Sequence, residues 1–315
     1  MLLTTLPIFI FSFFVIWFGA GLIVKSIDKI AKKLKLSTFV ISFFLLGLLT
    51  SIPEMALGLS AVGEGKPEIF VGNLLGGVVV IFLFIIPLLA ILGKGLSVNH
   101  TLSRKDLVLT LAVCCVPALA VIDQRVSNFE GMLLLGAYGF LFYTFQKKFS
   151  FFDKKETEVL SIKAYSFVDL LKVALGIGLV FVSSNYIVDQ TVAYSNHFQI
   201  PAFYIGLIVL SIGTNLPELS LALRGVVSGK KDVAFGDYLG SASANTLLFG
   251  VFTLINDGEV LTVNNFFVTF LFIAGGLGLF YYFARSGRII TRREGAILLS
   301  IYVLFVTYEL GREFF

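Results

Sequence analysis

The sequence predicts an all-α polytopic membrane protein whose ten transmembrane helices form two inverted repeats of five helices each. Three observations support this fold class: an apolar composition, a succession of long apolar stretches, and a repeat that relates the two halves of the chain. Of the 315 residues, 57% are hydrophobic and 14% are charged, whereas a soluble domain carries about 25% charged residues. The composition therefore excludes a soluble catalytic domain and places the chain in a lipid bilayer.

The apolar stretches are long enough to cross the membrane, since a spanning helix needs about 20 mostly apolar residues. The first stretch, near residues 4–24, lacks the basic segment and the cleavage site of a signal peptide, so we expect it to remain as the first span. Charged or turn-rich breaks delimit the other spans. These lie near residues 37–61, 68–93, 106–122, 129–146, 166–188, 202–226, 233–255, 262–284 and 293–311.

The distribution of basic residues predicts the topology, because cytoplasmic loops carry an excess of lysine and arginine. If the N-terminus faces outward, all but three of the 24 lysines and arginines fall in or beside cytoplasmic connections; the exceptions are Lys66, Arg125 and Arg312. Both termini are therefore expected outside. Short basic runs between spans are typical of topology determinants. No nucleic-acid partner is expected, and the lipid bilayer surrounds the chain.

A shift of 164 residues aligns much of the two halves without a gap. Each half contains five predicted spans, an odd number, so the second copy enters the membrane from the opposite side. Secondary transporters with inverted repeats bind their substrates near the membrane midplane, where helices from both halves meet. We divide the chain in its longest connection, into repeats 1–155 and 156–315. The shift superimposes Thr50 on Thr214, Pro53 on Pro217, Glu54 on Glu218, Gly72 on Gly236 and Gly76 on Gly240.

The second span of each half carries a proline followed by a glutamate, in GLLTSIPEMALG (47–58) and SIGTNLPELSLA (211–222). A proline inside a helix cannot donate a backbone hydrogen bond and leaves a carbonyl one turn earlier available. Glu54 and Glu218 have no lysine or arginine at the same membrane depth. A charge at the bilayer centre costs at least about 2.5 to 3.5 kcal/mol, so we expect a cation to compensate these two carboxylates.

The neighbouring groups indicate which kind of cation. Carboxylates, freed carbonyls and the hydroxyls of Thr50, Ser51 and Thr214 form an all-oxygen set, which suits a hard cation such as Ca²⁺. No histidine or cysteine lies near these motifs; Cys114 and Cys115 are expected to pack inside a helix, and His100 and His197 to lie in loops. The absence of a catalytic residue set predicts that the protein is not an enzyme and needs no cofactor.

The third span of each half adds polar side chains. In the second half, Asp237, Ser241 and Asn245 are four residues apart and share one face of a helix. We expect this face to point toward the two glutamates. Asn73 lies at the equivalent of Asp237 in the first half. The glycine pairs spaced by four residues in both spans allow neighbouring helices to approach closely.

At these residues the chain resembles the cation/calcium exchanger superfamily, particularly its prokaryotic sodium/calcium exchanger branch. The likeness rests on LTSIPE (49–54) and GTNLPE (213–218) and on the third-span motifs. It implies a ten-helix antiporter in the plasma membrane of a prokaryote, with rocking of the first and sixth spans. The implied Ca²⁺ ligands are Glu54, Glu218, Thr50 and Thr214, the Na⁺ ligands include Ser51 and Ser241, and the candidate site extends to Asn73, Asn215, Asp237 and Asn245.

The chain departs from the family pattern at four positions. Gly77 and Ile81 replace a serine and an amide in the first repeat, Asn215 replaces a serine, and Asp237 replaces an asparagine. The first repeat thus loses two side-chain ligands and the second gains a carboxylate. Glu54, Glu218 and Asp237 together carry up to three negative charges, enough for one Ca²⁺ and one proton or monovalent cation.

We therefore predict a secondary active antiporter that exchanges Ca²⁺ for Na⁺ by alternating access. A proton-coupled Ca²⁺ or cation exchanger is the nearest alternative, because the acidic residues could take up protons as Ca²⁺ leaves. A passive cation channel or a binding-only sensor is a further alternative, since Gly77 and Ile81 remove expected ligands.

Overall fold

The computed structural model describes residues 2–33, 43–44, 47–97, 103–148, 167–219, 223, 232–256, 259–262, 266–287 and 289–314. Helical structure is present within every predicted span. The first half contains α1 (Leu2–Lys33), α3 (Gly47–Thr50), α4 (Ile52–Gly63), α5 (Pro67–Val79), η2 (Val80–Ile85), α6 (Ile86–Leu92), α7 (Arg104–Ala120) and α8 (Asn128–Lys148). The second half contains α9 (Phe167–Phe198), α10 (Ala202–Tyr204), η4 (Ile205–Leu210), α11 (Ser211–Thr214), α13 (Asp232–Ile255), α14 (Phe267–Gly287) and α15 (Arg292–Phe314).

Several of these helices can cross a membrane by length and composition, so the protein is a multi-pass membrane protein. Two of the spans are mostly buried inside the protein, with 83% and 78% of their apolar windows covered, and form its centre; the other four are 28% to 39% covered and turn most of their surface outward. The buried pair is Pro67–Leu92 and Gly236–Ile255; the outer four are Thr5–Ile23, Leu171–Phe198, Phe267–Arg285 and Arg292–Gly311.

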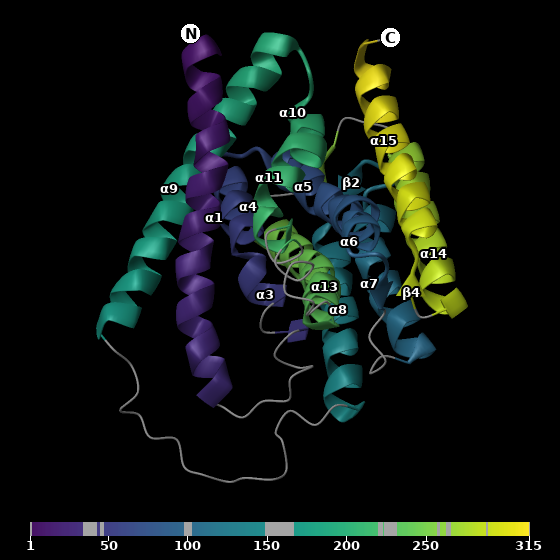
Figure 1. Cartoon of the computed structure of the whole chain (residues 1–315). Helices are drawn as coiled ribbons and strands as arrows, with labels where there is room; N and C mark the ends of the chain where they lie inside the picture. Colours follow the sequence, from purple (N-terminus) through teal and green to yellow (C-terminus); the bar gives the residue numbers. More distant parts are fainter. Residues whose placement is uncertain are drawn as a thin grey trace.

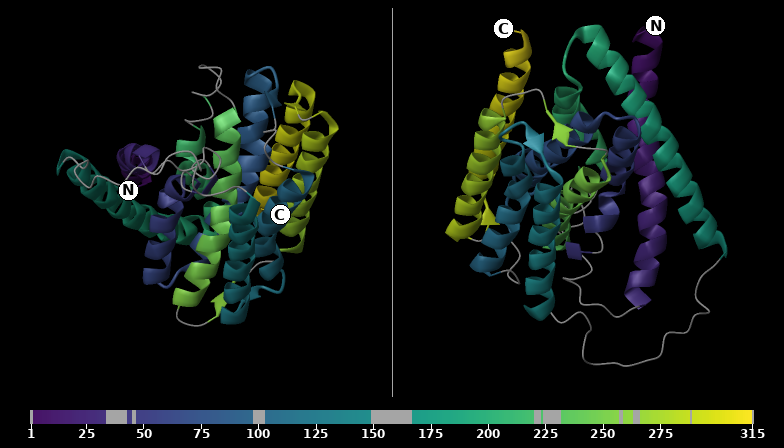
Figure 2. Two further views of the ribbon diagram at one scale, coloured as in Figure 1. Left: turned by 90° about the horizontal axis from the view of Figure 1, so that it is seen from below. Right: turned by 180° about the vertical axis from the view of Figure 1, so that it is seen from behind.

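Helices α1 and α9 pack against each other along one side of the molecule, and α14 and α15 lie on the opposite side (Figures 1 and 2). The short helices α3, α4 and α11 and the central helices α5 and α13 lie between these two pairs. Large apolar side chains such as Phe11 and Val182 are exposed on the outer helices, as expected where lipid replaces water. The start of α1 and the end of α15 lie at the same end of the molecule (Figure 1).

Two details differ from the sequence prediction. Helix α9 continues to Phe198, beyond its expected end near residue 188, so that His197 lies in the last helical turn and not in a loop; His100 lies outside the described residues. The all-α prediction also misses two antiparallel ladders of two residues per strand. They pair β1 (Leu96–Ser97) with β4 (Ile289–Ile290) and β2 (Arg125–Val126) with β3 (Val260–Leu261).

Glycines set how closely the central helices approach their neighbours. A methyl group added at Gly76 in α5 would lie 2.1 Å from the Leu207 carbonyl oxygen, and one at Gly240 in α13 would lie 1.8 Å from the Phe43 carbonyl oxygen. The shift of 164 residues relates these two contacts, because it superimposes Phe43 on Leu207 as well as Gly76 on Gly240. Both central helices therefore pack directly on backbone, as predicted for small residues at a helix interface.

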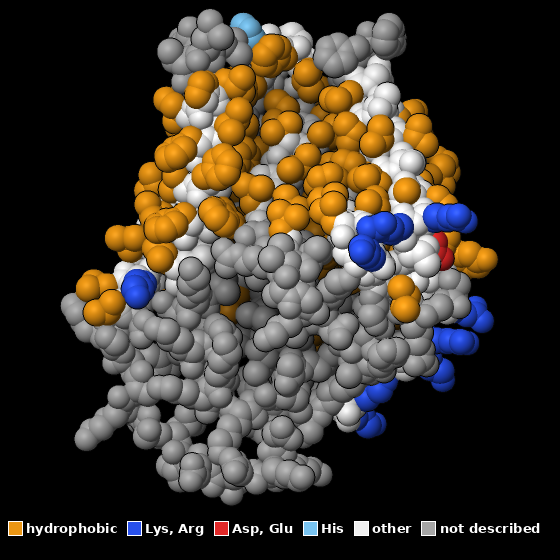
Figure 3. All heavy atoms as spheres, viewed as in Figure 1, with side chains coloured by type: hydrophobic (Ala, Val, Ile, Leu, Met, Phe, Trp, Pro, Cys, Tyr) orange, Lys and Arg blue, Asp and Glu red, His pale blue; other side chains and the backbone are white. Residues whose placement is uncertain are grey.

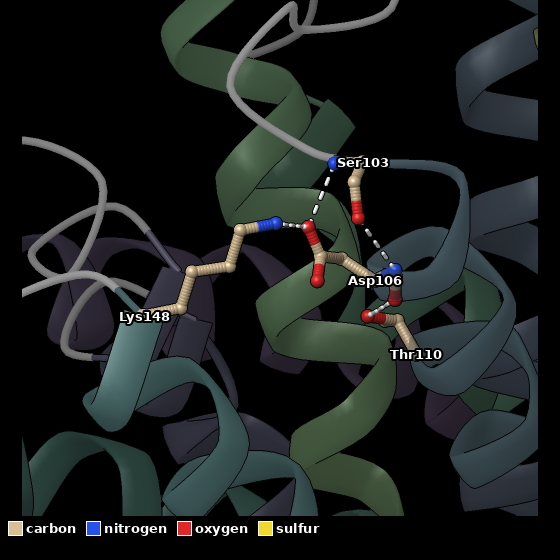
Figure 4. Close-up of polar contacts among 4 residues, drawn as sticks. All are labelled: Ser103, Asp106, Thr110 and Lys148. Atoms are coloured by element: carbon tan, nitrogen blue, oxygen red, sulfur yellow. Dashed lines mark hydrogen bonds and ion pairs between the residues drawn. The ribbon is translucent and has the colours of Figure 1, made fainter.

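A charged contact fastens α7 to α8 at the end of the molecule away from the chain ends. Ser103 and Asp106 form a reciprocal capping box at the start of α7: the Asp106 amide donates to Ser103 Oγ, and the Ser103 amide donates to Asp106 Oδ2 at 2.7 Å. Lys148, in the last turn of α8, forms an ion pair with the same Asp106 oxygen (Figure 4). Asp106 is thus a buried carboxylate that has a basic partner.

The glycine contact generates a stability prediction. Gly240→Ala places a methyl group against backbone that cannot rotate away, so we expect it to lower the free energy of unfolding by about 1–3 kcal/mol. SDS titration of the purified protein measures this value. Gly136→Ala is the matched control: nothing lies within 4 Å of a methyl group there, and the substitution should be neutral or stabilising. Equal effects of the two substitutions would contradict the packing role of Gly240.

Candidate cation site

Both proline motifs break their helices at equivalent positions. Helix α3 ends at Thr50, and α4 begins at Ile52 after the turn residue Ser51. Likewise α11 ends at Thr214, Asn215 is the turn residue, and residues 216–219 are helical. Because Pro53 and Pro217 have no amide proton, the ordinary helical hydrogen bonds to the carbonyls of Leu49 and Gly213 cannot form. The helix breaks therefore lie at the two Pro-Glu motifs, where the sequence placed the prolines.

Three carboxylates are buried around these breaks. Glu54 is 1% exposed, Glu218 is 0% exposed and Asp237 is 1% exposed. Glu218 is near enough to both Glu54 and Asp237 to repel each of them electrostatically. The structure thus brings together acids from both halves of the chain.

The polar face of α13 meets the break between α3 and α4. Ser241 Oγ donates to Glu218 Oε1 at 2.8 Å and lies 3.3 Å from Ser51 Oγ. The Thr50 hydroxyl lies 3.3 Å from the Gly47 carbonyl oxygen and 3.5 Å from Asp237 Oδ1, so its single proton is shared between them. This face of α13 therefore points toward the acidic residues, as its helical spacing indicated.

The equivalent contacts of α5 with α11 are neutral. Thr214 Oγ1 donates to Asn73 Oδ1 at 3.1 Å. Asn215 Nδ2 donates to the Ser211 carbonyl at 2.8 Å, and Asn245 Nδ2 donates to the Leu74 carbonyl at 3.2 Å. These bonds fix the amide orientations, since a carbonyl accepts only from the nitrogen of an amide.

Several oxygen atoms of the site have no hydrogen-bond partner within the described ranges. They are both carboxylate oxygens of Glu54, Glu218 Oε2, Asp237 Oδ2, Asn215 Oδ1 and Asn245 Oδ1. Across the same residues, no lysine or arginine pairs with any of the three acids. Buried polar atoms normally have partners, so this concentration of unpaired acceptors is the arrangement that a cation would satisfy.

The carboxylates do not make a metal site by themselves. In the part of the chain that the structure describes, no three histidine, cysteine, aspartate or glutamate side chains lie close enough to hold a metal ion. A cation bound here would take hydroxyl, amide or backbone oxygens as well. Such mixed oxygen ligation is typical of Ca²⁺.

Two polar residues of α13, Ser243 and Thr246, form hydrogen bonds away from the three acids, and Tyr238 beside these acids was not singled out from the sequence. Ser243 donates to the Gly240 carbonyl within α13, and Thr246 donates to the Val113 carbonyl of α7, so neither hydroxyl proton is directed to the three acids. Tyr238 is fully buried beside Asp237, and its hydroxyl has no partner among the described residues. The sequence gives no signal for this position, because a tyrosine in an apolar span is usually a packing residue.

Comparison with known proteins identifies similar chains over nearly the whole length. The sodium/calcium exchanger protein family matches residues 4–146 and 169–311. The putative antiporter CaxA of Alkalimonas amylolytica is 29% identical, with 96% of this chain and 97% of that protein covered. The sodium/calcium exchanger MaX1 of Methanosarcina acetivorans is 24% identical, with 91% and 93% covered. The solved structure of the sodium-calcium exchanger NCX_Mj has a TM-score of 0.69 at 23% identity and covers 98% of this chain and 99% of that chain, which shows a common fold.

The different surroundings of the buried acids generate a stability prediction. Glu54 has no basic partner in the described structure, whereas Asp106 is paired with Lys148. In buffer free of Na⁺ and Ca²⁺, Glu54→Gln should not lower the free energy of unfolding, because it removes an uncompensated charge. Asp106→Asn should lower it, by about 1 kcal/mol, because it breaks a partly exposed ion pair.

SDS titration of both variants beside the parent protein measures the difference. A loss of stability in Glu54→Gln as large as that in Asp106→Asn would show that Glu54 has a stabilising partner.

Proposed function

Because the chain belongs to the sodium/calcium exchanger family, we propose that it is a secondary active antiporter that exports Ca²⁺ in exchange for Na⁺. The observation that carries this proposal is the burial of Glu54, Glu218 and Asp237 around two helix breaks, with unpaired oxygens and no basic partner in the described residues. A divalent cation neutralises two of these charges at once. Transported cations are the cargo of this site, and the proposal requires no resident cofactor.

The carboxylates explain why exchange is obligatory. An empty site carries uncompensated charge through the membrane interior, which is costly. A site filled with Ca²⁺ or with monovalent cations is compensated in both cases, so it changes orientation more readily. The same acids therefore serve both loads, and each load displaces the other.

We assign the ligands from these contacts. Glu54 and Glu218, with the freed backbone oxygens next to Thr50 and Thr214, hold Ca²⁺. The hydroxyls of Ser51 and Ser241, which contact each other, hold the monovalent cation with the carboxylates; Ser241 also donates to Glu218. Helices α1 and α9, which pack together at one side of the centre, rock against it to provide alternating access.

We further propose ten transmembrane spans, arranged as inverted repeats over residues 1–155 and 156–315, with both termini outside the plasma membrane. Hydrophobic side chains cover a broad band of the surface, and the visible lysines and arginines lie away from the two chain ends (Figure 3). This distribution supports an outward position of both ends, because lysine and arginine favour the cytoplasmic side.

Ion fluxes in proteoliposomes test the coupling. With Na⁺, K⁺ and H⁺ gradients imposed one at a time, Ca²⁺ movement should be driven by the Na⁺ gradient and not by the K⁺ gradient. The third carboxylate, Asp237, makes proton coupling the specific competing mechanism. Ca²⁺ movement that dissipates a proton gradient in the absence of Na⁺ would establish that alternative and overturn the assignment of Na⁺.

Substitution of the acids tests the site. Glu54→Gln or Glu218→Gln should reduce Ca²⁺ flux by at least about 100-fold, because each removes half of the charge that compensates Ca²⁺. Glu309→Gln is the matched control: Glu309 is also a fully buried acid, but it accepts a hydrogen bond from Thr269 between α15 and α14, outside the site. Its flux should stay within about twofold, since a glutamine still accepts that bond. Retained flux in either site variant would contradict the assignment.

A further inference from the structure

The candidate site has two faces that the shift of 164 residues makes equivalent. On one face, α3 and its break contact α13; on the other, α11 and its break contact α5. The same threonine contact occurs on both: Thr50 Oγ1 lies 3.5 Å from Asp237 Oδ1, and Thr214 Oγ1 donates to Asn73 Oδ1 at 3.1 Å. Each of these residues on one face therefore has an equivalent on the other.

The first difference between the faces is charge. Asp237 and Asn73 occupy equivalent positions, are both buried, and differ in side-chain charge. Only the α3–α13 face adds a negative charge of its own to the two glutamates. A cation is attracted to this face by the carboxylate, whereas the amide at Asn73 offers it a single neutral oxygen, which already accepts the Thr214 proton.

The second difference is the pair of hydroxyls. On the α3–α13 face, Ser51 Oγ and Ser241 Oγ lie 3.3 Å apart, and Ser241 bonds Glu218. Their equivalents on the α11–α5 face are Asn215 and Gly77, so this face has no hydroxyl pair. A methyl group added at Gly77 would lie 2.7 Å from Asn245 Nδ2 and 3.3 Å from Asn215 Nδ2.

Two amide nitrogens therefore fill the place of the missing serine side chain. Both nitrogens carry hydrogens with partial positive charge and are held there by the carbonyls of Ser211 and Leu74. Donor groups repel a cation, because metal ions such as Na⁺ and Ca²⁺ bind oxygen acceptors. The charge difference and the hydroxyl difference thus favour the same face.

We propose that the monovalent coupling cation binds only on the α3–α13 face, and that the amides of Asn215 and Asn245 close the equivalent position around Gly77. This inference rests on the proposed function and specifies which part of the site binds the coupling ion. One consequence is that the chain couples Ca²⁺ to fewer monovalent cations than a site with hydroxyl pairs on both faces. The unpaired Oδ1 atoms of Asn215 and Asn245 remain available to Ca²⁺.

Alanine substitutions at equivalent positions test this assignment. Ser51→Ala should raise the Na⁺ concentration for half-maximal Ca²⁺ release from proteoliposomes about tenfold, the effect of losing roughly 1.4 kcal/mol of binding. Asn215→Ala should change this Na⁺ concentration less than about twofold. If it weakens ion binding, the change should be a higher Ca²⁺ concentration for half-maximal transport. Ca²⁺/Ca²⁺ exchange without Na⁺ is measured for each variant as well, so that a loss of Ca²⁺ binding is distinguished from a loss of Na⁺ binding.

A gain-of-site variant provides the second test. Gly77→Ser combined with Asn215→Ser introduces a hydroxyl pair on the α11–α5 face. If this pair binds a further Na⁺, the Hill coefficient for Na⁺ should increase by up to about one. Equal Na⁺ shifts in the two alanine variants, or an unchanged Hill coefficient in the double variant, would overturn the one-sided assignment. Wild-type Ca²⁺ flux without any Na⁺ response would instead overturn the proposed function, and the wild-type control reveals this before the variants are compared.

Discussion

The burial of acidic side chains without a basic partner is the constraint on which the site depends. Hydroxyls of Ser241 and Thr50 contact Glu218 and Asp237, but these neutral groups only reduce the cost of burying a charge. Both oxygens of Glu54 lack even this compensation among the described residues. An arginine or lysine at this point would stabilise the protein and would also occupy the place of the cargo. Under the proposed function, the site is therefore stabilised least when it is empty, as exchange requires.

Backbone geometry supports this arrangement from both sides. The helices break at Ser51 and Asn215, and the prolines that follow cannot donate the helical hydrogen bonds to the Leu49 and Gly213 carbonyls. Gly76 and Gly240 let the central helices reach the backbone of their neighbours. This close packing of α13 accompanies the hydrogen bond from Ser241 to Glu218.

The sequence predicted the local features of the site better than it predicted the extent of the elements. The Pro-Glu motifs, their equivalence and the polar face of α13 follow from spacing, because helical geometry relates residues a few positions apart. The end of α9 could not be predicted, since the polar residues before Phe198 resemble a loop in sequence and are helical in the structure. The two short strand pairs join connections that are distant in sequence. The amides that fill the place beside Gly77 come from the turn after α11 and from α13, so no local pattern indicated that they meet there.

The two faces of the site differ in side chains while their helix packing is the same. The reason is that the packing depends on residue size, whereas the difference in charge does not. A methyl group at Gly76 or Gly240 would meet a backbone oxygen within about 2 Å, so neither helix interface tolerates a larger residue. Aspartate and asparagine, by contrast, have nearly the same shape. Asp237 and Asn73 can therefore occupy equivalent positions and make similar contacts although only Asp237 is charged. Gly77 has no side chain where the equivalent Ser241 has one, and the amides of Asn215 and Asn245 occupy the space. Under the proposed function, two equivalent helix breaks can therefore bind different numbers of ions through a few side chains, as long as the glycines and prolines at both breaks are kept.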